Sequence, residues 1–200
     1  MRQQYLFIII KKESFNLIIL KLRITVGWWM NNQSRQALWL ALAGSIVLMI
    51  GMGYGRFAFT GVLPLMLNEG LLTLHEGNLA ASANYAGYLV GALLLARVQP
   101  GAATRLSIIS AGLTIASLAL LAWVSSPWTI ITLRAVAGAL SAITLIAGSL
   151  WLLEHMGHHH GAPLLYAGVG LGIFISAEGI ALGHALSLTS QQIWLLCALC

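Results

Sequence analysis

The 200-residue chain is 59% hydrophobic and 8% charged, and its mean hydropathy is +0.88. A soluble domain is usually about a quarter charged, so the composition excludes an ordinary water-soluble protein and indicates an all-α membrane protein. The formal net charge of +5 comes from residues before position 36, because four arginines balance four glutamates after it. A nucleic-acid-binding protein is therefore not indicated.

Residues 1–29 do not share the character of the rest of the chain. Their apolar pieces are interrupted by the charged run 11–13 and are too short to span a bilayer, and no small-residue cleavage site of the signal-peptide kind follows them. One interpretation is a basic amphipathic helix on the inner membrane surface. The other is an upstream extension that is not native to the functional protein, which would then begin at Met30 and cover residues 30–200.

Long apolar runs predict the membrane-spanning helices, since a span needs roughly 20 mostly apolar residues. The runs lie at 37–66, 79–96, 106–124, 128–152 and 162–183, with a sixth at 193–200. The connections between them are short and polar, as between neighbouring helices of a bundle. The sixth run reaches the end of the chain, so we expect a six-helix bundle whose last helix is truncated, in a fragment of a longer protein.

The basic residues predict the orientation of these helices, because cytoplasmic loops are enriched in lysine and arginine. Six of them precede residue 37 and two lie in the loop 97–105, whereas the loops 68–78, 125–127 and 184–192 carry none. We therefore expect a multi-pass protein of the cell (inner) membrane with a cytoplasmic amino terminus.

Two stretches of the chain carry a family resemblance. "GMGYGRFAFTGVLPLM" (51–66), followed by "ASANYAGYLVGALLLA" (81–96), resembles the first two helices of the YbfB/YjiJ branch of the major facilitator superfamily (MFS). The RxxxG pattern of the superfamily's fourth helix is matched by Arg134 and Gly138. The resemblance implies a twelve-helix secondary active transporter that works by alternating access, of which this chain holds the amino-terminal half.

Three ionisable residues lie inside the predicted spans, namely Arg56, Arg134 and Glu178. Each costs about 3 kcal/mol to insert, so each is a functional candidate. Counting about 1.5 Å per residue from the helix ends places all three in the outer half of the membrane. The resemblance implies in addition that their helices line the transport cavity.

The two guanidinium groups predict a substrate-binding site for a small organic anion, which Arg56 and Arg134 would bind bidentately. Glu178 would take up a proton and couple proton movement to transport. The alternatives are that the arginines extend to the outer membrane surface and that Glu178 forms a structural ion pair.

Smaller polar groups and glycines complete the candidate site. Asn84 and Tyr88 share one face of the second helix at i, i+4, and would hydrogen-bond either the substrate or a neighbouring helix. Glycines favour close helix packing or a hinge. The candidates for this role are Gly51, Gly53, Gly55, Gly138, Gly168 and Gly172.

No sequence motif indicates an enzyme, a cofactor or a metal site. The histidines of "EHMGHHHG" (154–161) lie on a glycine-containing loop, a pattern that does not define a metal geometry. The expected partners are the lipid bilayer, a small-molecule substrate and the missing carboxy-terminal six-helix half. The alternative function is a small membrane scaffold or subunit whose buried charges serve helix contacts and which transports nothing.

Overall fold

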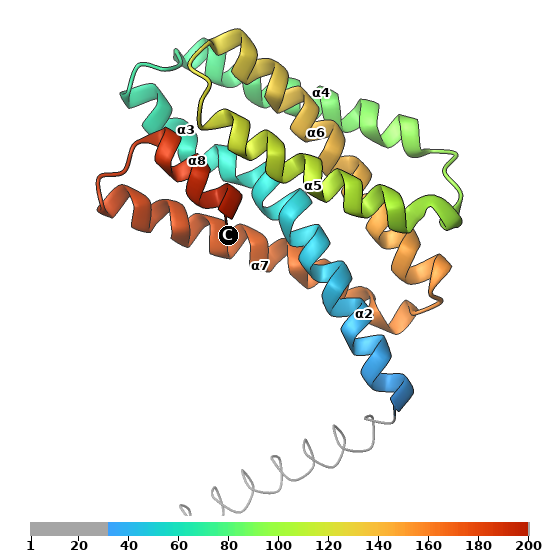
Figure 1. Cartoon of the computed structure of the whole chain (residues 1–200). Helices are drawn as coiled ribbons and strands as arrows, with labels where there is room; N and C mark the ends of the chain where they lie inside the picture. Colours follow the sequence, from blue (N-terminus) through green and yellow to red (C-terminus); the bar gives the residue numbers. More distant parts are fainter. Residues whose placement is uncertain (1–31, 200) are drawn as a thin grey trace, which may run out of the picture. The chain divides into compact units, whose positions relative to one another are not determined.

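The computed structural model describes residues 32–199, and every regular element within this range is a helix (Figure 1). The two interpretations of residues 1–29 therefore concern a segment outside the described residues. The chain divides into two compact units, Met1–Trp39 and Leu40–Cys200. The packing described below is that of the second unit.

Helices occur at every range where the sequence predicts one. The first consists of α2 (Asn32–Leu48), the π-helical segment η1 (Met49–Phe57) and α3 (Ala58–Asn68), which are continuous and which we call helix one. It is followed by α4 (Leu74–Leu95), η2 (Pro100–Ala102), α5 (Ala103–Leu121), α6 (Pro127–Ser149), the π-helical η3 (Leu150–His155), η4 (His159–Gly161), α7 (Ala162–Ala185) and α8 (Ser190–Leu199).

Among the described residues, four helical stretches are long and apolar enough to cross a membrane. They are Arg35–Asn68, Pro100–Leu121, Pro127–His155 and His159–Ala185. The prediction of six spans is thus met in part. α4 has 22 residues, but polar side chains such as Asn78 and Asn84 make it less apolar than these four, and α8 has only 10 residues.

The residues before α4 explain where this helix begins. The Thr73 hydroxyl accepts a hydrogen bond from the backbone N–H of Glu76 at 3.3 Å, and the Glu76 carboxylate accepts one from the backbone N–H of Thr73 at 2.8 Å. This reciprocal capping box satisfies two N–H groups that the start of a helix leaves free. The hydrogen bonds from the backbone and the hydroxyl of Thr73 lower the pKa of the Glu76 carboxyl.

Four helices are successive neighbours in the unit Leu40–Cys200. α4 packs along α6, α6 packs against η1, and η1 packs against α7. α5 and α8 contact each other, and α5 also contacts α6 and η1 (Figure 1). Helix one and α6 therefore lie at the centre of the packing, and the residues on their facing sides become candidates for a shared site.

Small residues allow these helices to approach closely. A Cβ atom added at Gly138 would lie 2.0 Å from the carbonyl oxygen of Asn84 on α4, and one added at Gly168 would lie 2.1 Å from that of Ser45 on helix one. Lipid is as apolar as a leucine side chain, so helix association in a membrane depends on such close packing. At these two positions no residue larger than glycine fits without moving a backbone.

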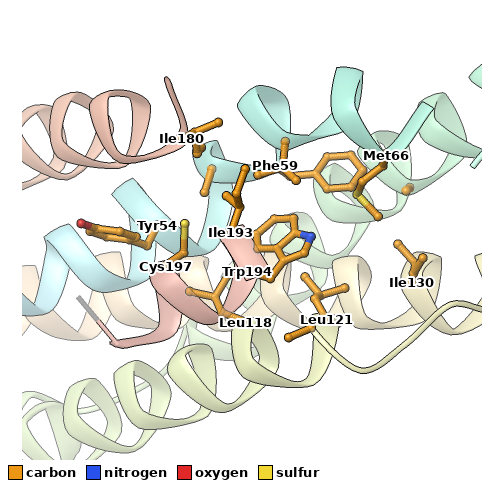
Figure 2. Packing of buried hydrophobic residues seen from close by; sticks show 14 of the residues in the cluster. Tyr54, Phe59, Met66, Leu118, Leu121, Ile130, Ile180, Ile193, Trp194 and Cys197 are labelled. Atoms are coloured by element: carbon orange, nitrogen blue, oxygen red, sulfur yellow. The ribbon is translucent and has the colours of Figure 1, made fainter. Parts of the chain in front are cut away.

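A cluster of large apolar side chains joins α8 to helix one and α5. Trp194 on α8 is fully buried and stacks on Phe59 of α3, with ring centroids 6.4 Å apart. Figure 2 shows Trp194 beside Leu118 and Leu121 of α5. The tryptophan thus anchors the short helix in the apolar core of the unit.

The carboxylate of Glu69, the residue that follows α3, caps the start of α8. It accepts hydrogen bonds from the backbone N–H of Ser190 at 2.8 Å and from the Ser190 hydroxyl. Ser190 opens α8 and is fully buried. The carboxylate therefore satisfies a buried N–H and places a negative charge at the positive end of the helix dipole.

Replacing Gly138 by alanine is expected to lower the free energy of unfolding by about 2 kcal/mol, because the methyl group must push α4 and α6 apart. The matched control is Gly112→Ala on α5, where an added Cβ would meet nothing within 4 Å; there, a gain of about 1 kcal/mol in helix propensity is expected. Unfolding by sodium dodecyl sulfate in mixed micelles, followed by circular dichroism, measures both variants. Equal stabilities would contradict this packing.

Removing the cap of α8 by Glu69→Ala is expected to raise amide hydrogen exchange in the first turn of α8 about fivefold, since an N-terminal cap contributes roughly 1 kcal/mol. Exchange in α6 is expected to stay unchanged. The control variant is Glu154→Ala, because the side chain of Glu154 is exposed and forms no hydrogen bond to any described residue. If both variants leave α8 equally protected, the carboxylate of Glu69 does not hold this helix.

Candidate functional site

Helix one changes its hydrogen-bonding pattern at the stretch that carries three glycines. The segment η1 is a nine-residue π-helix, Met49–Phe57, with Arg56 in its last turn. Glycine is about 1 kcal/mol less favourable than alanine in an α-helix, and π-helical segments within α-helices are frequent at functional sites. The glycine-rich sequence therefore favours an irregular backbone here, and η1 is a candidate functional region.

The glycines of η1 face three different helices. At each of them an added Cβ would collide with a neighbour, so the π-helical backbone is enclosed by close packing. A Cβ added at Gly51 would lie 2.5 Å from Thr144 of α6, and one added at Gly53 would lie 2.5 Å from Gly172 of α7. A Cβ added at Gly55 would lie 2.6 Å from Thr114 of α5.

Arg134 of α6 reaches the end of the π-helical segment. Its side chain is 1% exposed, and its Nη1 donates to the carbonyl oxygen of Gly55 at 2.9 Å while Nη2 donates to that of Arg56 at 3.0 Å. Its guanidinium carbon lies 4.5 Å from the ring centre of Phe59, and its Nε has no hydrogen-bond partner among the described residues. Backbone carbonyls at an irregular turn of a helix need a hydrogen-bond donor where water is scarce. Arg134 supplies this donor and thereby links α6 to helix one.

Asn84 adds α4 to this connection. Its side chain is 3% exposed, and its Nδ2 donates to the backbone carbonyl oxygen of Arg134 at 2.9 Å. A continuous chain of hydrogen bonds thus runs from α4 through α6 to helix one. The bond corresponds to the interhelical alternative of the sequence analysis, and substrate binding by Asn84 stays a prediction.

The guanidinium of Arg56 lies among three aromatic rings. Its carbon is 4.3 Å from the ring centre of Tyr88, 5.0 Å from that of Tyr85 and 5.7 Å from that of Phe57. Ring faces attract cations. Arg56 is half-buried, and within residues 32–199 its side chain forms neither an ion pair nor a hydrogen bond. We call these four residues the Arg56 cluster.

Glu178 lies away from these groups on the surface of α7. It is exposed and forms no ion pair with any described residue. Its position is about 200° around the helix from Ser176 and from Ile180, which are both buried on the face that packs towards helix one. Glu178 therefore faces away from helix one, and it does not pair with Arg56 or Arg134.

The structure brings together Arg56, Asn84, Tyr88 and Arg134 and leaves Glu178 outside this group. Tyr85 and Phe57 were not among the site residues predicted from the sequence. A signal for Tyr85 was present, because Tyr85 and Tyr88 are spaced i, i+3 and such residues also share a helix face. Phe57 directly follows Arg56 in the chain, and helix residues at i, i+1 do not face each other, so the spacing gave no signal for this contact.

The helical architecture and the buried arginine define the class first: a multi-pass membrane protein built of helices. A family model described as "Uncharacterised MFS-type transporter YbfB" matches residues 48–200. The chain belongs to this family of MFS transporters, which confirms the resemblance in its sequence. Membership also implies a transporter rather than an enzyme. Comparison with curated proteins and comparison with solved structures each gave no match.

The two arginines are expected to differ in their importance for stability. Arg134→Ala removes two charge-assisted hydrogen bonds from buried carbonyls and is expected to cost about 3 kcal/mol of unfolding free energy. Arg56→Ala removes partly exposed cation–π contacts and is expected to cost about 1 kcal/mol or less. Unfolding by sodium dodecyl sulfate in mixed micelles measures both losses.

Arg134→Lys serves as the conservative variant for this comparison. It is expected to recover less than half of the loss, because a lysine lacks the planar fork that reaches two carbonyl oxygens. Losses of equal size for Arg56→Ala and Arg134→Ala would contradict the structural role of Arg134.

Proposed function

We propose that the chain is the amino-terminal half of a secondary active transporter and that Arg56 binds a small organic anion. Family membership supports transport. The observation that carries the anion site is the guanidinium of Arg56, which lies among three rings and has no carboxylate partner in the described residues. A missing carboxy-terminal half would complete the cavity, and rocking of the two halves would give alternating access.

The environment of Arg56 supports an anionic rather than a cationic substrate. Moving a charge out of water is unfavourable unless it is paired, and aromatic faces compensate this loss only in part. A carboxylate would complete the compensation. Arg134 donates to the carbonyl oxygen of Arg56, so the guanidinium of Arg56 is the group left to pair with an anion.

We propose that the buried residues Arg134 and Asn84 position Arg56. Both Nη atoms of Arg134 and the amide of Asn84 are engaged with backbone carbonyls, so they would hold the backbone of Arg56 in place rather than contact the solute. Tyr88 would contact the substrate beside Arg56. The glycines of η1 would allow helix one to shift when the substrate binds.

Glu178 is proposed as the proton-coupling group. Glu178 is exposed on the face of α7 opposite helix one. The missing half could cover this carboxylate in one conformation of the transporter and expose it in the other. Carboxylates inside transporters commonly relay protons. Replacement by glutamine would then remove the dependence of transport on a pH gradient while leaving binding of the anion in place.

The distribution of basic residues supports an inner-membrane protein whose amino terminus is cytoplasmic. The exposed tryptophans Trp123 and Trp128, at the end of α5 and the start of α6, would then lie at the outer interface, where tryptophan is enriched.

The anion site is tested by thermal unfolding of the chain in lipid nanodiscs with acetate, lactate, benzoate, succinate or glycerol phosphate. At a concentration of about 100 Kd a bound anion stabilises by roughly 2.7 kcal/mol, so at least one of them is expected to raise the midpoint. The rise should persist in Arg97→Gln, a matched exposed arginine, and vanish in Arg56→Gln. Stabilisation that is equal in both variants, or absent for every anion, would overturn the proposed site.

A further inference from the structure

We infer that the anion bound by the Arg56 cluster is a monocarboxylate with a flat apolar body, of the kind that benzoate represents. The inference rests on the proposed function and adds to it the class of substrate. Its basis is the number of positive charges that face a ligand and the nature of the surface around them.

The Arg56 cluster offers one positive charge to a ligand. The side chain of Arg56 is half-buried and has no hydrogen bond to a described residue, whereas Arg134 is 1% exposed and both of its Nη atoms already donate to carbonyls. Arg97 lies 12 residues (97 − 85) beyond Tyr85, about 18 Å along the helix direction. One carboxylate neutralises one guanidinium, and a dianion would retain an unpaired charge away from water.

The surface around Arg56 is aromatic and apolar. Tyr85 is 62% exposed and Phe57 is 37% exposed, so both offer free ring surface beside the guanidinium. One turn away from Tyr85 on the same face of α4 lie Ala81 and Leu89, and Leu89 is exposed. A polyhydroxylated solute would find few hydrogen-bond partners there, whereas a flat apolar body would stack on the rings.

The two kinds of contact are compatible at one guanidinium. Cation–π contacts engage the face of the guanidinium plane, and a carboxylate engages its N–H edge through two parallel hydrogen bonds. The rings of Tyr85 and Tyr88 would therefore orient Arg56 for the carboxylate, and the exposed ring of Tyr85 would receive the body of the ligand. The carboxylate and the apolar body of one small molecule would thus both be bound between Arg56 of helix one and the tyrosines of α4.

The test is isothermal titration of the chain in lipid nanodiscs with four probes: benzoate, gluconate, phthalate and benzylamine. Benzoate is expected to bind about tenfold more tightly than gluconate or phthalate, and benzylamine is expected not to bind. Arg56→Gln and Tyr85→Ala should each weaken benzoate binding about tenfold or more. Tyr85→Leu, which keeps the apolar volume but loses the ring, should weaken it in the same direction and replaces Tyr85→Ala if that variant does not fold.

The matched controls are Arg97→Gln and Tyr166→Ala, which change an arginine and a tyrosine outside the Arg56 cluster and should leave benzoate binding unchanged. Tighter binding of gluconate or phthalate that still requires Arg56 would overturn the inference and leave the anion site intact. Benzoate binding that survives Arg56→Gln, or the absence of binding by every anion, would overturn the inference and the proposed site together.

Discussion

Two carbonyl oxygens of helix one, those of Gly55 and Arg56, accept hydrogen bonds from a single buried guanidinium, that of Arg134. The π-helical segment η1 ends at these residues, and its backbone would otherwise leave polar groups without donors in an apolar interior. The same arginine rests on Phe59, which in turn stacks on Trp194 of α8. The fixed position of Arg134 thus connects the irregular turn of helix one with the core of the unit.

The two arginines have different roles in this arrangement. A guanidinium has five N–H donors. Arg134 directs both of its Nη atoms to the backbone, while the side chain of Arg56 donates no hydrogen bond to a described residue. The glycines before Arg56 bring helix one against side chains of α5 and α6 and against the backbone of α7, so the side chain of Arg56 is carried on a closely enclosed backbone. In the described conformation, close packing of this kind holds the backbone of Arg56 in the position from which its side chain meets a ligand.

The sequence predicts the helices well because long apolar runs and short polar connections are read directly from composition. It also predicts that Arg56 and Arg134 lie at similar depth, since helix rise converts residue counts into distance. Counting does not give rotation about the helix axis, so the depth of Glu178 suggested a partnership with the arginines that the structure does not show. The hydrogen bonds from Arg134 to backbone carbonyls lie at the π-helical segment η1, and no periodicity in the sequence predicts that segment.

The bond between Glu69 and Ser190 joins residues that lie 121 positions apart. A ribosome delivers Glu69 to the membrane long before Ser190, so helix one, α4, α5, α6 and α7 enter the bilayer while this carboxylate has no helix to cap. The Glu69 carboxylate gains its hydrogen bonds to Ser190 only after α8 arrives, and Trp194 then packs against apolar residues of helix one and α5. The contacts of α8, a helix of 10 residues, therefore form after those among the helices that precede it in the chain.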